Sequence, residues 1–393
     1  MYRLGSGLAA GAFALLSASC GTTTRQPTNE AAHPRAIVEK ATSPILPLRS
    51  EKSASASPSD AQRREPSRIL LLRGDKSPYE VLSDDGTVLA SLQLASGSDG
   101  GEWIGNVQPK LSPNEPLVAE IKEDGLWLRY FDGTAKQIVP ESPEAWMTLA
   151  GWSPDGQTLL FHRELHSDLD DQPNVTPHGV TGFHLLHRKD YSVERLSRSI
   201  RGFEFWDADS QHIFSYDLAH LIRTDVHRGA KETLRECKCC FQLSHLGQQI
   251  VFSQTVPPCS VSQETKWALK KGSLLGNDET VLVEGEGGSE DYQWPKGSPN
   301  GGNIAFEHHG YIAFDHRRRR NKETIEVLAN HPDAKPREIY ECDMQNEHSE
   351  CNLAAWMSED ALVVLNNGVA KKVTLGGEVT TLASNIAYVV SGY

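Results

Sequence analysis

The chain has 393 residues, enough for two average domains or for one large closed β or α/β domain. Its 38% hydrophobic and 23% charged residues lie in the ordinary globular range, which excludes a multi-spanning membrane protein and a wholly disordered chain. With 39 basic and 52 acidic residues the net charge is -13, so nucleic acid would on average be repelled and is not expected as a partner.

The first twenty residues have the pattern of an export signal. Arg3 precedes an apolar stretch, Leu4–Leu16, that is too short to span a bilayer, and small residues then lead to Cys20 and Gly21. This arrangement resembles the lipobox of bacterial lipoproteins, which implies cleavage before Cys20 and diacylation of its sulfur. The family prefers leucine three places before the cysteine, where Ser17 stands. The alternative is an ordinary secretory signal with an incidental cysteine.

Residues 21–66 differ sharply in composition from the rest of the chain. These 46 residues include 6 prolines, 11 serines or threonines and 7 alanines, but no phenylalanine, tryptophan or tyrosine. A segment with so little apolar surface to bury does not order itself. We therefore expect a signal peptide over residues 1–19, the lipidated cysteine and a disordered tether over residues 20–66, and a folded domain over residues 67–393.

The clearest motif of the folded part is Gly151–Gly156, which reads GWSPDG and precedes the apolar run Gln157–Phe161. Serine at the first turn position bonds the backbone, proline at the second sets φ near −65°, and glycine is favoured at the fourth. The motif therefore predicts a type I turn that leads into a β-strand.

Degenerate copies of this motif recur along the chain, each before an apolar run. Their anchor residues are Ser112, Ser153, Asp207, Ser244, Ser298 and Ser358, at intervals of 41, 54, 37, 54 and 60 residues. These intervals bracket and exceed one four-stranded propeller blade. The 327 residues from 67 to 393 divide into seven units of about 47 residues, a length that fits a blade with loop insertions.

The first unit lacks one strand, and the end of the chain can supply it. Three strands are expected ahead of the first anchor, namely Ile69–Leu72, Tyr79–Leu82 and Thr87–Leu92. The segment Ile386–Val390 is left over after the last unit is complete. We expect it to pair with the first blade and close the ring, with Ile386, Tyr388 and Val390 on one face.

The Trp-Ser-Pro-Asp-Gly motif and its following strand resemble the repeat of TolB-type, WD-like β-propellers. The resemblance covers most of residues 67–393. It implies an all-β propeller of four-stranded blades, and the unit length of about 47 residues favours seven blades, with six or eight as alternatives. TolB has six blades and an additional N-terminal α/β domain, so its partners are not carried over to this chain.

Six cysteines besides Cys20 are an even number, which favours disulfides in an exported chain. We expect one bridge between Cys342 and Cys351, nine residues apart between two predicted blades. The other disulfide candidates are Cys237, Cys239, Cys240 and Cys259. Cys237, Cys239 and Cys240 contain a Cys-x-x-Cys pattern. We prefer a structural disulfide to Cys259, and metal or redox chemistry is the alternative.

No catalytic residue is predicted, because the sequence lacks Gly-x-Ser-x-Gly, P-loop, His-Glu-x-x-His and EF-hand motifs. The insertion after Phe161 mixes imidazole and carboxylate groups, as divalent-metal sites do. Its candidate ligands are His162, His166, Asp168, Asp170, Asp171 and His178, followed by His184 and His187. Their spacing matches no template, so a solvated loop is the preferred interpretation and no cofactor is expected, a divalent metal being the alternative.

A basic run interrupts this acidic protein and comprises Arg317, Arg318, Arg319, Arg320 and Lys322. It could dock phosphate head groups or acidic polysaccharide, but a solvated hairpin tip balanced by nearby acids is preferred. Seven tryptophans recur near blade starts: Trp103, Trp127, Trp146, Trp152, Trp206, Trp294 and Trp356. We assign them to core or inter-blade packing rather than to a sugar-binding platform.

Two classes of function remain. The preferred one is a non-enzymatic propeller lipoprotein of the bacterial cell envelope that binds a protein or an envelope component through its loop face. Its lipid would be its sole membrane anchor, and we expect it at the outer membrane, facing the periplasm or the cell surface. The alternative is a hydrolase or lyase whose site lies in the propeller channel and combines single residues from different blades.

Overall fold

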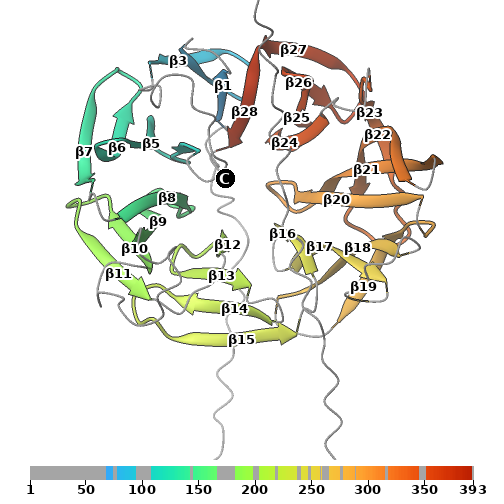
Figure 1. Cartoon of the computed structure of the whole chain (residues 1–393), viewed down its shortest axis with the longest axis horizontal. Coiled ribbons are helices and arrows are strands. Elements are labelled where there is room, and N and C mark those ends of the chain that lie inside the picture. The colour runs from blue at the N-terminus through green and yellow to red at the C-terminus, as the bar shows by residue number, and fades with distance from the viewer. Residues whose placement is uncertain are drawn as a thin grey trace, which may run out of the picture. The chain divides into compact units, whose positions relative to one another are not determined.

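Seven four-stranded antiparallel sheets form the folded part of the chain, and Figure 1 shows them around a common centre as the blades of a propeller. The structure is a computed structural model that describes residues 68–73, 78–93, 108–141, 145–165, 182–197, 203–216, 220–236, 240–246, 249–256, 258, 265–274, 278–287, 289–314, 317–344 and 351–391. Within these ranges there are only strands, turns and irregular segments, and no helix long and apolar enough to cross a membrane. The all-β, seven-bladed propeller is thus confirmed.

Blades 2 to 7 each consist of four consecutive strands, whereas blade 1 takes its innermost strand from the end of the chain. Blade 1 contains β28 (Ile386–Ser391), β1 (Ile69–Arg73), β2 (Tyr79–Leu82) and β3 (Val88–Leu92). Blade 2 contains β4 (Lys110–Leu111), β5 (Leu117–Lys122), β6 (Gly125–Tyr130) and β7 (Ala135–Pro140). Blade 3 contains β8 (Ala145–Trp152), β9 (Thr158–Leu165), β10 (Gly182–His187) and β11 (Val193–Ser197). Blade 4 contains β12 (Phe203–Trp206), β13 (His212–Tyr216), β14 (His220–Asp225) and β15 (Lys231–Glu236).

The remaining blades follow the same order from the centre outward. Blade 5 contains β16 (Cys240–Leu246), β17 (Gln249–Val256), β18 (Lys266–Ser273) and β19 (Glu279–Glu284). Blade 6 contains β20 (Glu290–Gly297), β21 (Asn303–Phe314), β22 (Arg317–Ala329) and β23 (Arg337–Glu341). Blade 7 contains β24 (Cys351–Ser358), β25 (Ala361–Asn366), β26 (Val369–Thr374) and β27 (Val379–Ser384).

The recurring turn motif connects the two innermost strands of a blade. In blade 3 the Gly156 N–H donates to Ser153 O at 2.8 Å, and the Ser153 hydroxyl donates to Asp155 Oδ1 at 2.6 Å. Gly156 has φ +67°, a conformation that favours glycine. Ser298 bonds the Asn300 side chain in the same way at 3.0 Å, which explains why asparagine replaces aspartate there. Ser244 differs from this pattern, because it lies inside β16 beside a β-bulge.

Three tryptophans connect neighbouring blades through one backbone position. Each indole N–H donates to the carbonyl that lies two residues before the turn anchor of the preceding blade. The pairs are Trp152 to Lys110 O at 3.0 Å, Trp206 to Gly151 O at 3.1 Å and Trp356 to Lys296 O at 3.0 Å. All three side chains are buried, so the predicted inter-blade packing is confirmed for them.

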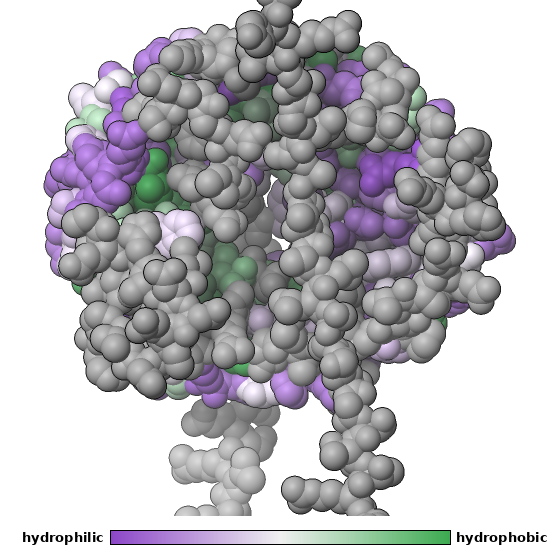
Figure 2. Space-filling view, in the orientation of Figure 1, coloured by the Kyte–Doolittle hydropathy of each residue, from purple (hydrophilic) through white to green (hydrophobic). Residues whose placement is uncertain are grey.

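Each blade packs apolar side chains on both of its faces. In β21, Ile304 and Phe306 pack against blade 5, whereas Ala305 lies between them in sequence and packs against Leu353 of blade 7. The outermost strands have mostly exposed residues, and Figure 2 shows a largely hydrophilic outer rim on the face that it presents. The blade faces therefore form the core, and polar groups on those faces need hydrogen-bond or ion-pair partners.

The ring closes as predicted, by antiparallel pairing of β28 with β1, in which Leu70 pairs with Val390 and Leu72 with Tyr388. Val390 packs with the cluster shared by blades 1 and 2, whereas Ile386 packs with the cluster shared by blades 1 and 7. The expectation that Ile386, Tyr388 and Val390 share one face is wrong for Ile386. A register shift between Leu72 and Arg73 turns it toward blade 7.

Deleting residues 385–393 should unfold or aggregate the propeller, because it removes β28 from both clusters and exposes the edge of β1. The loss of buried Ile386 and Val390 alone corresponds to about 3–6 kcal/mol. Thermal melting and size-exclusion chromatography will measure the effect, with a chain lacking only residues 392–393 as the control. A deletion variant that melts within a few degrees of the intact protein would show that β28 does not close the ring.

Candidate functional site

A row of ionisable side chains crosses blade 6 on the face toward blade 7. The strand register pairs Asp291 of β20 with His309 of β21, and His309 with Glu323 of β22. Glu307 lies two residues before His309 and therefore points to the same face. All four side chains are buried, with relative exposures of 1–5%.

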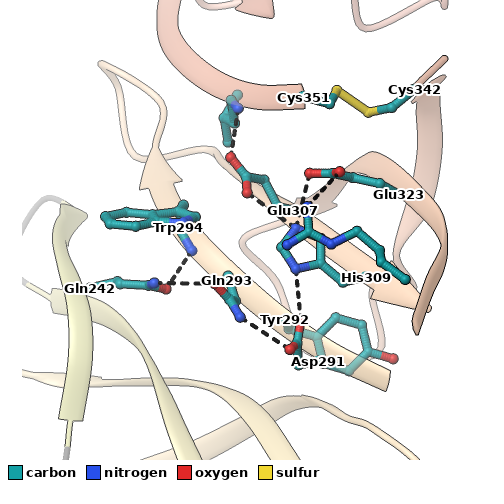
Figure 3. A network of polar contacts seen from close by, with 12 residues as sticks. Gln242, Asp291, Tyr292, Gln293, Trp294, Glu307, His309, Glu323, Cys342 and Cys351 are labelled. Atoms are coloured by element: carbon teal, nitrogen blue, oxygen red, sulfur yellow. Dashed lines mark hydrogen bonds and ion pairs between the residues drawn. A yellow bond between two sulfur atoms is a disulfide. The ribbon is translucent and has the colours of Figure 1, made fainter. Parts of the chain in front are cut away.

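The imidazole of His309 lies at the centre of this row (Figure 3). Its Nδ1 is 2.9 Å from Asp291 Oδ1, and its Nε2 is 3.1 Å from Glu323 Oε1 and 3.3 Å from Glu307 Oε2. We call Asp291, Glu307, His309 and Glu323 the His309 cluster. It brings three carboxylates and one imidazole together where water does not reach.

Each carboxylate of the His309 cluster has a further partner. The Leu353 N–H of β24 donates to Glu307 Oε1 at 2.7 Å, which joins the cluster to blade 7. Arg320 Nη1 donates to Glu323 Oε2 at 2.9 Å, and the Tyr311 hydroxyl donates to Asp291 Oδ2 at 2.9 Å. These bonds fix one oxygen of each carboxylate and leave the other directed at the imidazole.

The environment of the cluster shifts the pKa values of its members. Burial raises the pKa of Glu307, although the neighbouring His309 opposes that shift. Burial would lower the pKa of His309, but Asp291, Glu307 and Glu323 outweigh it and raise the pKa to about 10. Burial and then the charge of Asp291 raise the pKa of Tyr311 to about 12. A substrate cannot reach these buried groups, so the cluster is not placed for acid–base catalysis.

A second feature lies on the innermost strands of blades 5 and 6. Gln242 and Trp294 each have a left-handed backbone, with φ +55° and +50°, and each sits in a β-bulge. The backbone N–H of Trp294 donates to Gln242 Oε1 at 2.7 Å, so this hydrogen bond connects the two bulges. The Trp294 side chain is 43% exposed. A bulky residue in this conformation is unusual, and such strain concentrates at functional sites.

Two lysines occupy equivalent positions on innermost strands, two residues before the turn anchors of blades 2 and 6. Lys110 and Lys296 are both partly exposed. Burial, and then the charge of Lys296, lowers the pKa of Lys110, so the two ammonium groups influence each other. Burial also lowers the pKa of Lys296, against the opposing charge of Glu307.

The tryptophan prediction is therefore only partly right. Trp146 of β8 is 43% exposed, as Trp294 is, and the assignment of these two side chains to buried packing is wrong. Both belong to innermost strands. Trp103 lies outside the described residues.

Among the predicted disulfides, the bridge between Cys342 and Cys351 is confirmed. It joins the end of blade 6 to the first residue of β24, beside Glu323, whose carbonyl accepts a hydrogen bond from the Cys342 N–H at 2.9 Å. Cys240 is buried and disulfide-bonded. Cys237, Cys239 and Cys259 lie outside the described residues, as does Cys20, so their roles stay predictions.

The histidine-rich insertion is described only at its two ends. His162 packs against the Phe183 ring at 5.0 Å, and burial lowers its pKa. His184 stacks on Phe161 at 5.4 Å, and its Nδ1 is 2.9 Å from Gly182 O. His187 Nε2 is 3.5 Å from Glu194 Oε2. The other candidate ligands, His166, Asp168, Asp170, Asp171 and His178, lie outside the described residues.

The basic run forms the start of β22, just after the tip of the hairpin between β21 and β22. Arg320 pairs with Glu323, and Lys322 Nζ is 2.8 Å from Glu338 Oε2. The predicted balance by nearby acids is confirmed for these two residues. Nothing is described of the Arg317, Arg318 and Arg319 side chains.

The His309 cluster was not predicted from the sequence. Its only signal was the abrupt change from the apolar run Ile304–Phe306 to Glu307, His308 and His309 within one strand. The partners Asp291 and Glu323 are found only when the register of three strands is known.

Another group of potential metal ligands, Asp207, Asp209 and His212, lies in the turn between β12 and β13. Asp209 Oδ2 is 2.6 Å from His212 Nδ1, and Asp207 Oδ2 accepts from Arg223 Nη2 at 2.7 Å. Asp209 Oδ1 also accepts two backbone N–H bonds, as in a side-chain-supported turn. The hydrogen bonds of this group therefore stabilise the turn between β12 and β13 of blade 4.

No family model and no curated protein matches the chain. Solved propeller structures match its fold. The Pyrococcus horikoshii acylaminoacyl peptidase aligns with a TM-score of 0.50 and 14% identity, over 78% of this chain and 48% of its own. TolB from Acinetobacter baumannii aligns with a TM-score of 0.41 and 13% identity, over 70% of this chain and 63% of its own. An oligogalacturonate lyase in complex with manganese aligns with a TM-score of 0.47 and 15% identity, over 68% of this chain and 73% of its own. Identities this low show the propeller fold alone.

The buried His184 should make the stability of the protein depend on pH. Burial lowers its folded-state pKa to about 4, below the ordinary value of 6.5, so the unfolded chain binds the proton more readily. The free energy of unfolding that depends on neutral His184 is fully present above pH 6.5 and is lost as the pH falls toward 4. Between pH 7 and 5, wild type should lose about 2 kcal/mol more unfolding free energy than His184→Leu in urea titrations.

The exposed His227 offers the matched control, and His227→Gln should keep the wild-type pH dependence. Equal pH dependence of wild type and His184→Leu would contradict the assignment of this loss to His184.

Proposed function

We propose that this protein is a lipid-anchored propeller of the bacterial cell envelope that binds a protein or another envelope component and is not an enzyme. The export signal ending at Cys20 and the tether over residues 21–66 support attachment to a membrane by lipid alone. Its place in this proposal is the outer membrane, facing the periplasm or the cell surface.

The observation that carries the binding role is the display of Trp294. Its strained backbone is held by a bulge and by the Gln242 side chain, yet its indole remains 43% exposed on an innermost strand. A half-exposed indole offers a large apolar surface and an N–H donor, which suits recognition of a partner. The partly exposed Lys110 and Lys296 on other innermost positions add positive charge, which favours an anionic group on that partner.

The enzymatic alternative is less well supported by the same residues. The His309 cluster combines an imidazole with carboxylates but is 1–5% exposed, and the Asp207, Asp209 and His212 group is engaged in a turn with Arg223. Binding therefore accounts for the accessible side chains better than hydrolysis or elimination does.

The anchoring part of the proposal predicts that Cys20→Ser moves the protein from the membrane to the soluble fraction of the envelope. The tether has no other apolar anchor, so loss of the acyl chains removes the membrane attachment. Fractionation and mass spectrometry of the mature N-terminus measure both the location and the modification. Unchanged membrane association of Cys20→Ser would refute the lipid anchor.

The binding part predicts a saturable, stoichiometric complex in cross-linked envelope extracts, whose yield falls about tenfold or more with Trp294→Ala. Val379→Ala, at a 48% exposed position on the outermost strand β27, is the matched control and should retain the complex. Equal loss from both variants, or turnover of glycans or esters by the purified protein without a partner, would contradict a binding role for the ring centre.

A further inference from the structure

Three donor atoms of the His309 cluster converge on one point. Glu307 Oε2, His309 Nε2 and Glu323 Oε1 lie within 4.8 Å of one another, and the nitrogen is 3.3 Å and 3.1 Å from the two oxygens. Ligands about 2.0–2.1 Å from a tetrahedral ion lie about 3.4 Å apart. The spacing of these atoms therefore fits a single ion bound by all three residues.

The hydrogen bonding of the cluster is incomplete despite the short distances. Among the described residues, neither ring nitrogen of His309 has a well-aligned hydrogen bond, and neither Glu323 Oε1 nor Asp291 Oδ1 has one, although all four atoms are buried and lie in ion-pair contact. The carboxylate oxygens lie near the ring nitrogens but away from the directions of the N–H bonds. Buried polar atoms without partners are rare in native proteins, and a bound ion is one of the few arrangements that satisfies them.

The other polar atoms of the three residues are already held in the way that metal sites require. Glu307 Oε1 accepts from Leu353 N, and Glu323 Oε2 accepts from Arg320. Asp291 lies 2.9 Å from His309 Nδ1, where a carboxylate orients a metal-binding imidazole through its second nitrogen (Figure 3). In each of the three residues, one polar atom of the side chain is thus held by a neighbouring group, and the other is left for the ion.

The charges in direct contact also call for a cation. The three carboxylates of Asp291, Glu307 and Glu323 face one imidazole and one guanidinium, that of Arg320. A divalent ion that displaces the ring proton of His309 would raise the positive charge beside these buried carboxylates by one.

We propose that Glu307, His309 and Glu323 form a structural site for one divalent transition-metal ion, with Zn²⁺ as the best match. One imidazole nitrogen and two carboxylate oxygens suit Zn²⁺, whereas Ca²⁺ prefers six to eight oxygen ligands. Because the ligands are 1–2% exposed, the ion has no route to a substrate and serves the fold. The ion joins β21 to β22 within blade 6, and Glu307 connects the site to β24 of blade 7 through the Leu353 N–H, near the Cys342–Cys351 disulfide.

The test is titration of the chelator-treated full-length chain with Zn²⁺ alone, by calorimetry and by metal analysis of the product. Wild type should bind one Zn²⁺ per chain and melt at a higher temperature with the ion than without it. Glu307→Gln and Glu323→Gln should each weaken Zn²⁺ binding by more than about 100-fold, because each removes a charged ligand. Asp291→Asn, at the orienting position, should weaken it by about 10–100-fold and shift the visible spectrum of the Co²⁺ form.

His212→Gln, in the turn group of blade 4, is the matched control and should leave the stoichiometry and affinity unchanged. Glu307→Gln keeps an oxygen that can accept from Leu353, so it is the variant that should disturb folding least, and circular dichroism checks each variant. Less than one Zn²⁺ per wild-type chain at micromolar free ion would overturn the site. So would Zn²⁺ binding that survives both glutamate variants, or binding that His212→Gln abolishes.

Discussion

The structure depends on one constraint, namely that every blade must bury both of its faces against its neighbours. An open ring would leave two blades with an apolar face in water, and the pairing of β28 with β1 prevents this. The bulge at Leu72 and Arg73 lets the closing strand serve both sides, with Ile386 packed toward blade 7 and Val390 toward blade 2. Closure by strands from opposite ends of the chain makes the ring one cooperative unit.

Some of the polar groups on the blade faces join one blade to the next. The tryptophan bonds do this with a single donor and a backbone carbonyl, as between Trp356 and Lys296. The His309 cluster carries more charge into the same kind of interface, where Glu307 accepts a hydrogen bond from Leu353 of blade 7. A bound ion would give the buried polar atoms of this interface a partner. The Cys342–Cys351 disulfide lies near the same interface.

The sequence was sufficient for the parts of the fold that local chemistry determines. The Ser153–Gly156 turn follows from its own residues, and the shortage of one strand before Ser112 pointed to closure by the end of the chain. It was insufficient where neighbouring strands decide the outcome. The His309 cluster needs the register of β20, β21 and β22, and the bulge that displays Trp294 needs the Gln242 side chain of another blade. The face of Ile386 was wrong because a one-residue register shift reverses the alternation of side chains.

We propose a binding surface near the ring centre, around Trp294, and a buried ion site on the face of blade 6 toward blade 7. Asp291 and Trp294 belong to the same strand, β20, and Asp291 Oδ1 lies 2.9 Å from His309 Nδ1, so the two features share one strand. X-ray absorption spectroscopy of the full chain loaded with one equivalent of Zn²⁺ tests the proposed ion site at Glu307, His309 and Glu323 most directly. If the ion binds at the His309 cluster, its ligands will be nitrogen and oxygen at about 2.0–2.1 Å and will include one imidazole. Sulfur at about 2.3 Å would place the ion at cysteines and contradict this site.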